Sequence, residues 1–86
     1  MKYFVYILQC ADDTLYTGVT KDVKKRIDRH NRGDGARYTR GRVPVTLVYH
    51  EELANIKSAL ARERYLRKLP RTKKKKLIIN FQNKYL

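Results

Sequence analysis

The sequence predicts an α+β fold in which a small three-stranded antiparallel sheet is flanked by helices. Two strand-like runs stand close together at the start of the chain, a third follows later, and apolar residues at helical spacing fill the remaining segments. The expected order is therefore β-β-α-β-α-α. The chain is short and contains neither repeats nor a linker, so residues 1–86 are expected to form one domain.

The first two strands are expected to form a hairpin. Residues 2–10 are rich in aromatic and β-branched side chains, and their nearly continuous apolarity predicts burial on both faces. A polar turn separates them from the second strand, residues 15–20. The hairpin would bring Tyr6 and Tyr16 toward the same region. Gly18 inside the second strand indicates either a bulge or a close approach of another group to the backbone.

A helix is expected next, capped by Asp22, running to about Arg32 and stopped by Gly33-Asp34-Gly35. A connection rich in glycine and arginine follows and contains Tyr38. Residues 45–51 alternate well enough to form the third strand. The predicted inward stripe of the helix, with Arg26 beside it, is Val23, Ile27 and His30.

Two further helices complete the chain. Asn55 or Ser58 is expected to cap the first of them, which would end near Leu69, just before Pro70. Thr72 is expected to cap the last helix, which begins with lysines and continues into an apolar segment.

Basic residues strongly outnumber acidic ones, 21 to eight, which gives a net charge of +13. Nine of them lie within residues 21–42 and nine within 62–76, where Glu63 is the single acid. Such a field attracts polyanions and binds phosphate groups with release of counterions. Nucleic acid, either DNA or RNA, is therefore the expected partner. No membrane association is expected, although residues 73–79 leave an anionic membrane surface as a distant alternative.

Cys10 is the only cysteine, which excludes an intramolecular disulfide and a cysteine-based zinc site. The first apolar stretch, residues 3–8, is too short for a signal peptide or a membrane span. A monomeric, cytoplasmic protein is expected. Catalysis by a serine or cysteine nucleophile is not indicated, because the single serine, Ser58, has no plausible base nearby in sequence.

Glu63 is the most informative single residue, because it lies on the apolar stripe of its predicted helix. A carboxylate on a core-facing stripe is costly unless it is paired or bound to a metal ion. An ion pair with Arg67, one turn further along, is the structural alternative to a metal ligand. The stripe consists of Ile56, Ala59, Leu60, Leu66 and Leu69.

Arg26 and His30 stand four residues apart and so share one face of the first helix. An arginine there can hold a phosphate with two hydrogen bonds and stabilise charge developing on phosphorus. The alternatives are a solvated basic face for Arg26 and a half-buried, backbone-bonded role for His30. A tyrosine hydroxyl near a metal ion or an arginine can help to activate water.

Together these residues resemble the GIY-YIG endonuclease superfamily, and most closely its short, stand-alone bacterial members. Val5-Tyr6-Ile7 stands at the first motif and Tyr16-Thr17-Gly18 at the second. Residues 22–31 and 35–40 are similar to signatures of that subgroup, and Glu63 stands where the family places its metal ligand. Val5 replaces the first glycine of the motif, and lysines stand where many members have an asparagine after the glutamate.

The resemblance implies hydrolysis of DNA phosphodiester bonds with one divalent ion, Mg²⁺ or Mn²⁺, held by Glu63. It implies that Tyr16, with or without Tyr6, activates or orients the attacking water. Arg26 would stabilise the transition state, and His30 would move a proton or bind phosphate. Branched, nicked or damaged DNA is the expected substrate, in repair or recombination. The basic and aromatic residues expected to contact nucleic acid are Lys24, Lys25, Arg29, Tyr38, Arg40, Arg67, Lys73 and Lys74.

A second function class remains open. The chain could be a DNA- or RNA-binding module that has kept the fold but cleaves little. Such a module would bind with a steep salt dependence and would be indifferent to Glu63→Ala.

Overall fold

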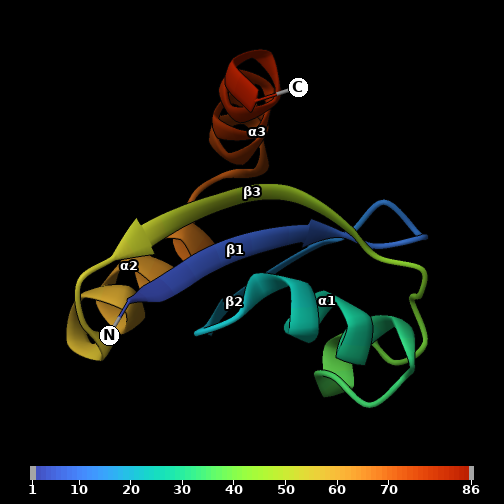
Figure 1. Ribbon diagram of the computed structural model, residues 1–86. Coiled ribbons are helices and arrows are strands. Elements are labelled where there is room, and N and C mark those ends of the chain that lie inside the picture. Colours follow the sequence, from blue (N-terminus) through green and yellow to red (C-terminus); the bar gives the residue numbers. More distant parts are fainter. Residues whose placement is uncertain (1, 86) are drawn as a thin grey trace.

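The computed structural model describes residues 2–85, and the expected α+β class is confirmed: a three-stranded antiparallel sheet with three α-helices (Figure 1). The strands and helices begin within about two residues of the expected positions, and the strands and the first two helices also end there. A short 3-10 helix in the connection, η1, was not expected. The elements are β1 (Tyr3–Gln9), β2 (Leu15–Thr20), α1 (Val23–Asn31), η1 (Arg37–Thr39), β3 (Thr46–Leu53), α2 (Ile56–Lys68) and α3 (Arg71–Tyr85).

The strand order is β2-β1-β3, so β1 lies at the centre of the sheet. Both neighbours run antiparallel to it, and Tyr6 on β1 faces Gly18 on β2 and His50 on β3. Because β1 is covered on both faces, all four residues from Val5 to Leu8 are buried. The burial on both faces that the apolar run predicted is therefore confirmed.

Each face of the sheet has its own core, and Figure 1 shows α1 and α2 on opposite sides of it. The core on the α1 side contains Tyr6, Leu8, Cys10 and Val45, with Tyr16, Ile27, Val43 and Leu47 packed around them. The core on the α2 side contains Val5, Ala59 and Leu66, with Val19, Tyr49, Leu53, Leu69 and Leu77 among the residues around them.

The helix caps follow local sequence chemistry at two of three sites. The Asp22 carboxylate accepts a hydrogen bond from the Lys25 N–H, and the Asn55 side chain accepts one from the Ser58 N–H. Asn55 rather than Ser58 is thus the cap of α2. The expectation for Thr72 was wrong, because Thr72 lies inside α3, which begins at Arg71. The Pro70 carbonyl accepts hydrogen bonds from the N–H groups of Lys73 and Lys74.

The predicted apolar stripe of α2 is only partly confirmed. Ala59 and Leu66 are fully buried, whereas Ile56 and Leu60 remain 43% and 45% exposed. The reason is geometric: positions 56 and 60 lie on the flank of the helix, and a sheet of three strands is too narrow to cover it. A pattern of apolar residues overstates burial when the partner surface is small.

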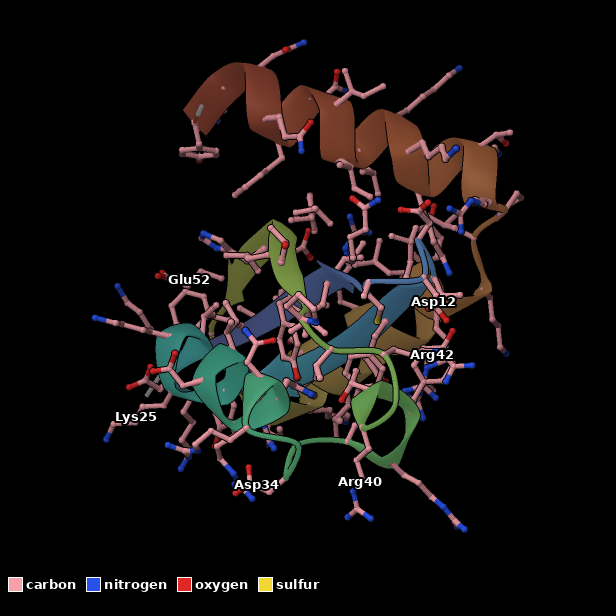
Figure 2. All side chains as sticks on the ribbon, turned by 90° about the vertical axis from the view of Figure 1, so that its right-hand side faces the viewer. Asp12, Lys25, Asp34, Arg40, Arg42 and Glu52 are labelled. Carbon is pink, nitrogen blue, oxygen red and sulfur yellow. The ribbon has the colours of Figure 1, made fainter. Side chains whose placement is uncertain are left out.

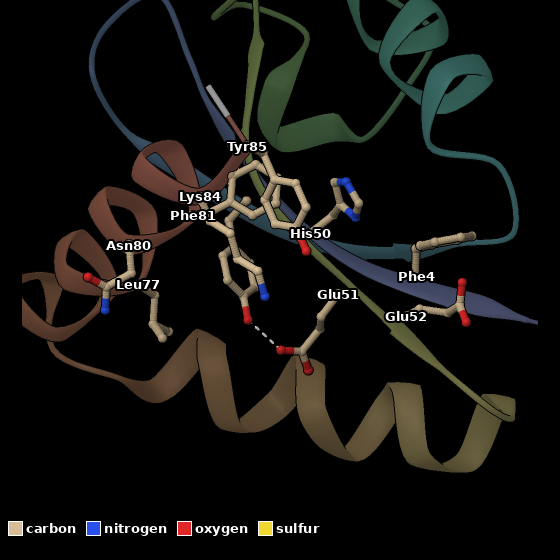
Figure 3. A pocket seen from close by; sticks show the side chains of 10 residues that line it. Phe4, His50, Glu51, Glu52, Leu77, Asn80, Phe81, Lys84 and Tyr85 are labelled. Atoms are coloured by element: carbon tan, nitrogen blue, oxygen red, sulfur yellow. Dashed lines mark hydrogen bonds between the residues drawn. The ribbon is translucent and has the colours of Figure 1, made fainter.

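The last helix, α3, packs beside β3 at one edge of the sheet, and Figure 1 shows the helix nearly end-on above that strand. A hollow of about 540 Å³ opens between the two, and aromatic side chains line much of it (Figure 3). His50 packs there with its ring centroid 5.1 Å from that of Phe81. Asn80 lines this hollow, which includes none of the predicted catalytic residues. No helix within residues 2–85 combines the length and apolarity that crossing a membrane requires.

Candidate active site

The site begins with a close approach between Tyr6 and the backbone of β2. A Cβ atom on Gly18 would lie 2.5 Å from the Tyr6 hydroxyl oxygen, so only glycine lets the Tyr6 side chain lie across that strand. Of the two possibilities for Gly18, the close approach is the one found. The sheet irregularity lies instead between Ile7 and Leu8, where β1 meets β3.

Tyr6, Tyr16 and His30 form a compact aromatic cluster. The His30 ring centroid lies 5.3 Å from that of Tyr16 and 6.1 Å from that of Tyr6, both in edge-on contact. The Tyr6 hydroxyl and His30 Nε2 are 3.1 Å apart and share a hydrogen bond. Tyr6 and His30 are 2% and 1% exposed, whereas Tyr16 is half-buried and faces a surface hollow. Tyr16 is therefore the hydroxyl that a water molecule or substrate can reach.

The buried members of the cluster are held in their uncharged forms. Burial raises the pKa of Tyr6 well above its ordinary value, with a further contribution from the neighbouring Tyr16. Burial lowers the pKa of His30, and the positive charges of Arg26 and Arg29 lower it further. At neutral pH, Tyr6 is thus a phenol and His30 a neutral imidazole that donates through one ring nitrogen and accepts through the other.

The connection after α1 folds over the His30 ring. Thr39, completely buried, lies with its hydroxyl oxygen 2.7 Å from His30 Nδ1, and the Ala36 N–H points at the same nitrogen from 3.3 Å. The half-buried, backbone-bonded role considered for His30 is corrected on two points. The residue is fully buried, and its two shortest contacts are with side chains.

Gly35 permits this closure, which leads to a first prediction. A Cβ at this position would lie 2.3 Å from His30 Nδ1 and 2.8 Å from His30 Cα. Gly35→Ala should lower the free energy of unfolding by about 1–3 kcal/mol, the usual cost of overpacking, measured by chemical denaturation. Gly41→Ala is the control, because nothing lies within 4 Å of its Cβ position. Equal effects of the two substitutions would contradict this role of Gly35.

Beside Tyr16, a hollow of about 340 Å³ is lined by Tyr38, Arg67 and Lys74 together with β2. The Tyr38 ring stacks on Tyr16 with centroids 5.9 Å apart, and the Arg42 guanidinium lies 4.3 Å from the Tyr38 centroid. An ion pair with Asp12 holds Arg42 in place, and Figure 2 shows the two side chains together. Three of the predicted nucleic-acid contacts thus gather next to the aromatic cluster.

Arg26 lines a second hollow, of about 230 Å³, together with Lys25 and Arg29 and the segment that joins β2 to α1. The positive charge of Arg26 acts to lower the pKa of both Tyr6 and His30, so this basic hollow lies close to the aromatic cluster. Lys24, Arg40 and Lys73 are exposed and line neither hollow; Figure 2 shows Arg40 pointing away into solvent.

Glu63 is mostly buried, with 12% of its side chain exposed, and forms an ion pair with Arg67. The ion pair that the sequence offered as an alternative is therefore present. The negative charge of Glu63 contributes to the raised pKa of Tyr6, so the carboxylate lies close to the cluster. Within residues 2–85, no three or more His, Cys, Asp or Glu side chains gather in the manner of a metal site.

A single carboxylate nevertheless fits one kind of metal ion. Mg²⁺ commonly binds through one or two carboxylates and completes its shell with water and substrate phosphates. The hard carboxylate oxygens of Glu63 suit that ion, provided that Arg67 turns away, for which its exposed side chain leaves room. The residues present are thus compatible with one divalent ion held at Glu63.

Thr39 and Gly35 were missed as site residues by sequence reasoning. The stretch 35–40 stood out as a signature, but no local pattern shows that its residues close over the His30 ring. Both act through contacts that exist only after α1 and the following connection have packed together.

Comparisons with known proteins identify the family to which this chain belongs. The model of the GIY-YIG catalytic domain matches residues 2–76. A UPF0213 protein of Clostridium perfringens is 55% identical over 75 residues, 87% of this chain and 81% of that protein. A UPF0213 protein of Staphylococcus aureus is 50% identical over 76 residues, which cover 88% and 93% of the two chains.

Two solved structures have the same fold. A UPF0213 protein of Bacillus halodurans, solved by NMR, has a TM-score of 0.58 at 44% identity, covering 91% of this chain and 83% of that one. A protein of E. faecalis has a TM-score of 0.63 at 31% identity, covering 95% and 88%. The chain belongs to the GIY-YIG family, whose members are generally DNA endonucleases that use divalent metal ions.

Proposed function

We propose that this protein is a metal-dependent endonuclease that hydrolyses phosphodiester bonds in DNA. The observation that supports this function best is the position of Tyr16. Its half-buried ring rests on the Tyr6–His30 pair and faces a hollow lined by Arg67 and Lys74. A hydroxyl that is anchored on one side and open to a basic hollow on the other suits a residue that orients water beside a phosphate.

The two basic hollows account for substrate binding in this proposal. Lys25 and Arg29 line one of them, and Arg67 and Lys74 line the other, with the aromatic cluster nearby. A DNA strand running from one to the other would place a phosphate near Arg26 and Tyr16. These contacts reach phosphates rather than base edges, so low sequence specificity is expected.

In the proposed reaction the Tyr16 oxygen accepts a hydrogen bond from the attacking water and aims it at phosphorus. The water oxygen bonds to phosphorus as it gives up a proton to solvent, the bond to the leaving oxygen breaks, and the leaving oxygen takes up a proton from solvent. Arg26 offsets the negative charge that develops on the phosphate oxygens. Glu63 would hold the divalent ion, which supplies Lewis-acid stabilisation of the same charge.

The test is cleavage of supercoiled, single-stranded and branched DNA in the presence of Mg²⁺ or Mn²⁺, with EDTA as the control. We expect cleavage that EDTA abolishes. Persistent cleavage in EDTA would contradict the metal requirement, and a folded, DNA-binding protein without cleavage would contradict the nuclease function.

A DNA- or RNA-binding module is the second candidate, and the Glu63–Arg67 ion pair favours it, since the pairing occupies the carboxylate that a metal ion needs. Such a module would bind DNA with a steep salt dependence, and Glu63→Ala would leave binding unchanged. It would show no EDTA-sensitive cleavage. The same preparation therefore separates the two functions.

A further inference from the structure

A buried chain of polar groups runs inward from the cluster to the backbone of the connection after α1. The Tyr6 hydroxyl lies 3.1 Å from His30 Nε2, and His30 Nδ1 lies 2.7 Å from the Thr39 hydroxyl oxygen. That hydroxyl lies 2.9 Å from the Ala36 carbonyl oxygen. Tyr6, His30 and Thr39 are each at most 2% exposed, so water cannot replace any of these partners.

The positions of the hydrogen atoms follow from the ends of this chain. The Ala36 carbonyl only accepts, so the single hydrogen of the Thr39 hydroxyl is donated to it. The Thr39 oxygen then faces His30 Nδ1 with a lone pair, and the 2.7 Å contact requires the hydrogen on Nδ1. Nε2 is left as the acceptor for the Tyr6 O–H.

One contact favours the opposite tautomer. The Ala36 N–H points at His30 Nδ1 from 3.3 Å and could donate only if that nitrogen had a free lone pair. It is the longest contact of the set, and the alternative would bring two acceptor oxygens, those of Thr39 and Ala36, to 2.9 Å without a hydrogen between them. The balance between the tautomers thus depends on the Thr39 hydroxyl.

Resting on the proposed function, we propose that Thr39 is a positioning residue that sets the direction of hydrogen bonding through His30 and Tyr6 to Tyr16. With the hydrogen on Nδ1, the Tyr6 O–H is donated inward to Nε2. The lone pairs of the Tyr6 oxygen then remain available to the O–H of Tyr16, whose ring centroid lies 6.2 Å from that of Tyr6 and whose side chain acts on the Tyr6 hydroxyl. The Tyr16 hydroxyl hydrogen then points inward, and its lone pairs face the hollow, as a residue that receives a hydrogen bond from water requires.

The experiment combines two readouts on wild type, Thr39→Val and Thr39→Ser. Nitrogen-15 NMR of the imidazole rings reports which nitrogen of His30 is protonated, and His50→Gln assigns the signals, because the chain has two histidines. We expect the hydrogen on Nδ1 in wild type and Thr39→Ser, and on Nε2 in Thr39→Val. We expect kcat for DNA cleavage to fall by roughly 10- to 100-fold in Thr39→Val, with KM nearly unchanged.

Thr46→Val, at an exposed position of β3, controls for the loss of a threonine hydroxyl as such. A wild-type protein protonated on Nε2 would overturn the inference even if Thr39→Val did not fold. A Thr39→Ser variant that loses both the tautomer and the activity would also overturn it, since packing of the methyl group would then be responsible. The NMR readout needs no substrate, so absence of wild-type cleavage would reveal a failure of the proposed function separately.

Discussion

Replacing Glu63 with glutamine is expected to reduce metal-dependent DNA cleavage by about 10³-fold or more, because the substitution removes the charge that would hold the divalent ion. DNA affinity should not fall. The Glu63 carboxylate is paired with Arg67, and its removal frees a positive charge beside the hollow next to Tyr16. Cleavage rates at saturating Mg²⁺ and a binding isotherm in EDTA, on the same preparation, measure the two effects.

Glu52→Gln is the matched control, because Glu52 is an exposed carboxylate whose ion pair with Lys2 lies at the surface. It should cleave like wild type. If Glu63→Gln lost cleavage and binding together, with a lower melting temperature, the residue would be structural. If it cleaved at the wild-type rate, Glu63 would not be the metal ligand.

Tyr16→Phe has the second largest expected effect, a loss of about 10²-fold in kcat with the fold intact. The substitution removes one hydroxyl and leaves the ring, so the contacts with His30 and Tyr38 remain. The loss should therefore appear in kcat rather than in the free energy of unfolding. Single-turnover cleavage and a denaturation curve provide the two measurements.

Tyr65→Phe offers a control with the same chemical change, since Tyr65 is 56% exposed on α2 and its ring contact with Arg62 does not need the hydroxyl. Wild-type cleavage by Tyr16→Phe would exclude a role of that hydroxyl in handling water. Unfolding of the variant under assay conditions would show instead that the hydroxyl supports the cluster.

Much of the fold follows from local rules. Asp22 and Asn55 cap their helices because their short side chains reach an N–H three residues on, a contact within one turn. Two predictions failed, one on the cap of α3 and one on the buried stripe of α2. Thr72 has the right chemistry for a cap, but the Pro70 carbonyl, two residues earlier, accepts the first hydrogen bonds of the helix. The exposure of Ile56 and Leu60 depends on the width of the sheet, which no property of α2 predicts.

The residues of the candidate site were likewise predictable only in part. Tyr6, Tyr16, Arg26, His30, Glu63 and the basic clusters were identifiable from motifs and charge, and the structure gathers these five residues in one region. The different positions of the two tyrosines could not be predicted from the sequence. Tyr6 and Tyr16 look equivalent as motif residues, yet the first is buried against His30 and the second faces a hollow.

By itself, the sequence determined the class of fold, the order of its elements and the kind of polyanionic partner that a charge of +13 favours. These properties depend on composition and on contacts within a few residues. Only the tertiary structure decided that Gly18 makes room for Tyr6 and that Thr39 bonds to His30. It also decided that Glu63 lies near Tyr6 while paired with Arg67. The approaches of Gly18 and Glu63 to Tyr6 join residues far apart in the chain, and the contact between Thr39 and His30 depends on how the connection after α1 packs, which no local pattern encodes. The Glu63–Arg67 pair lies within one turn of α2 and was one of the alternatives that the sequence offered.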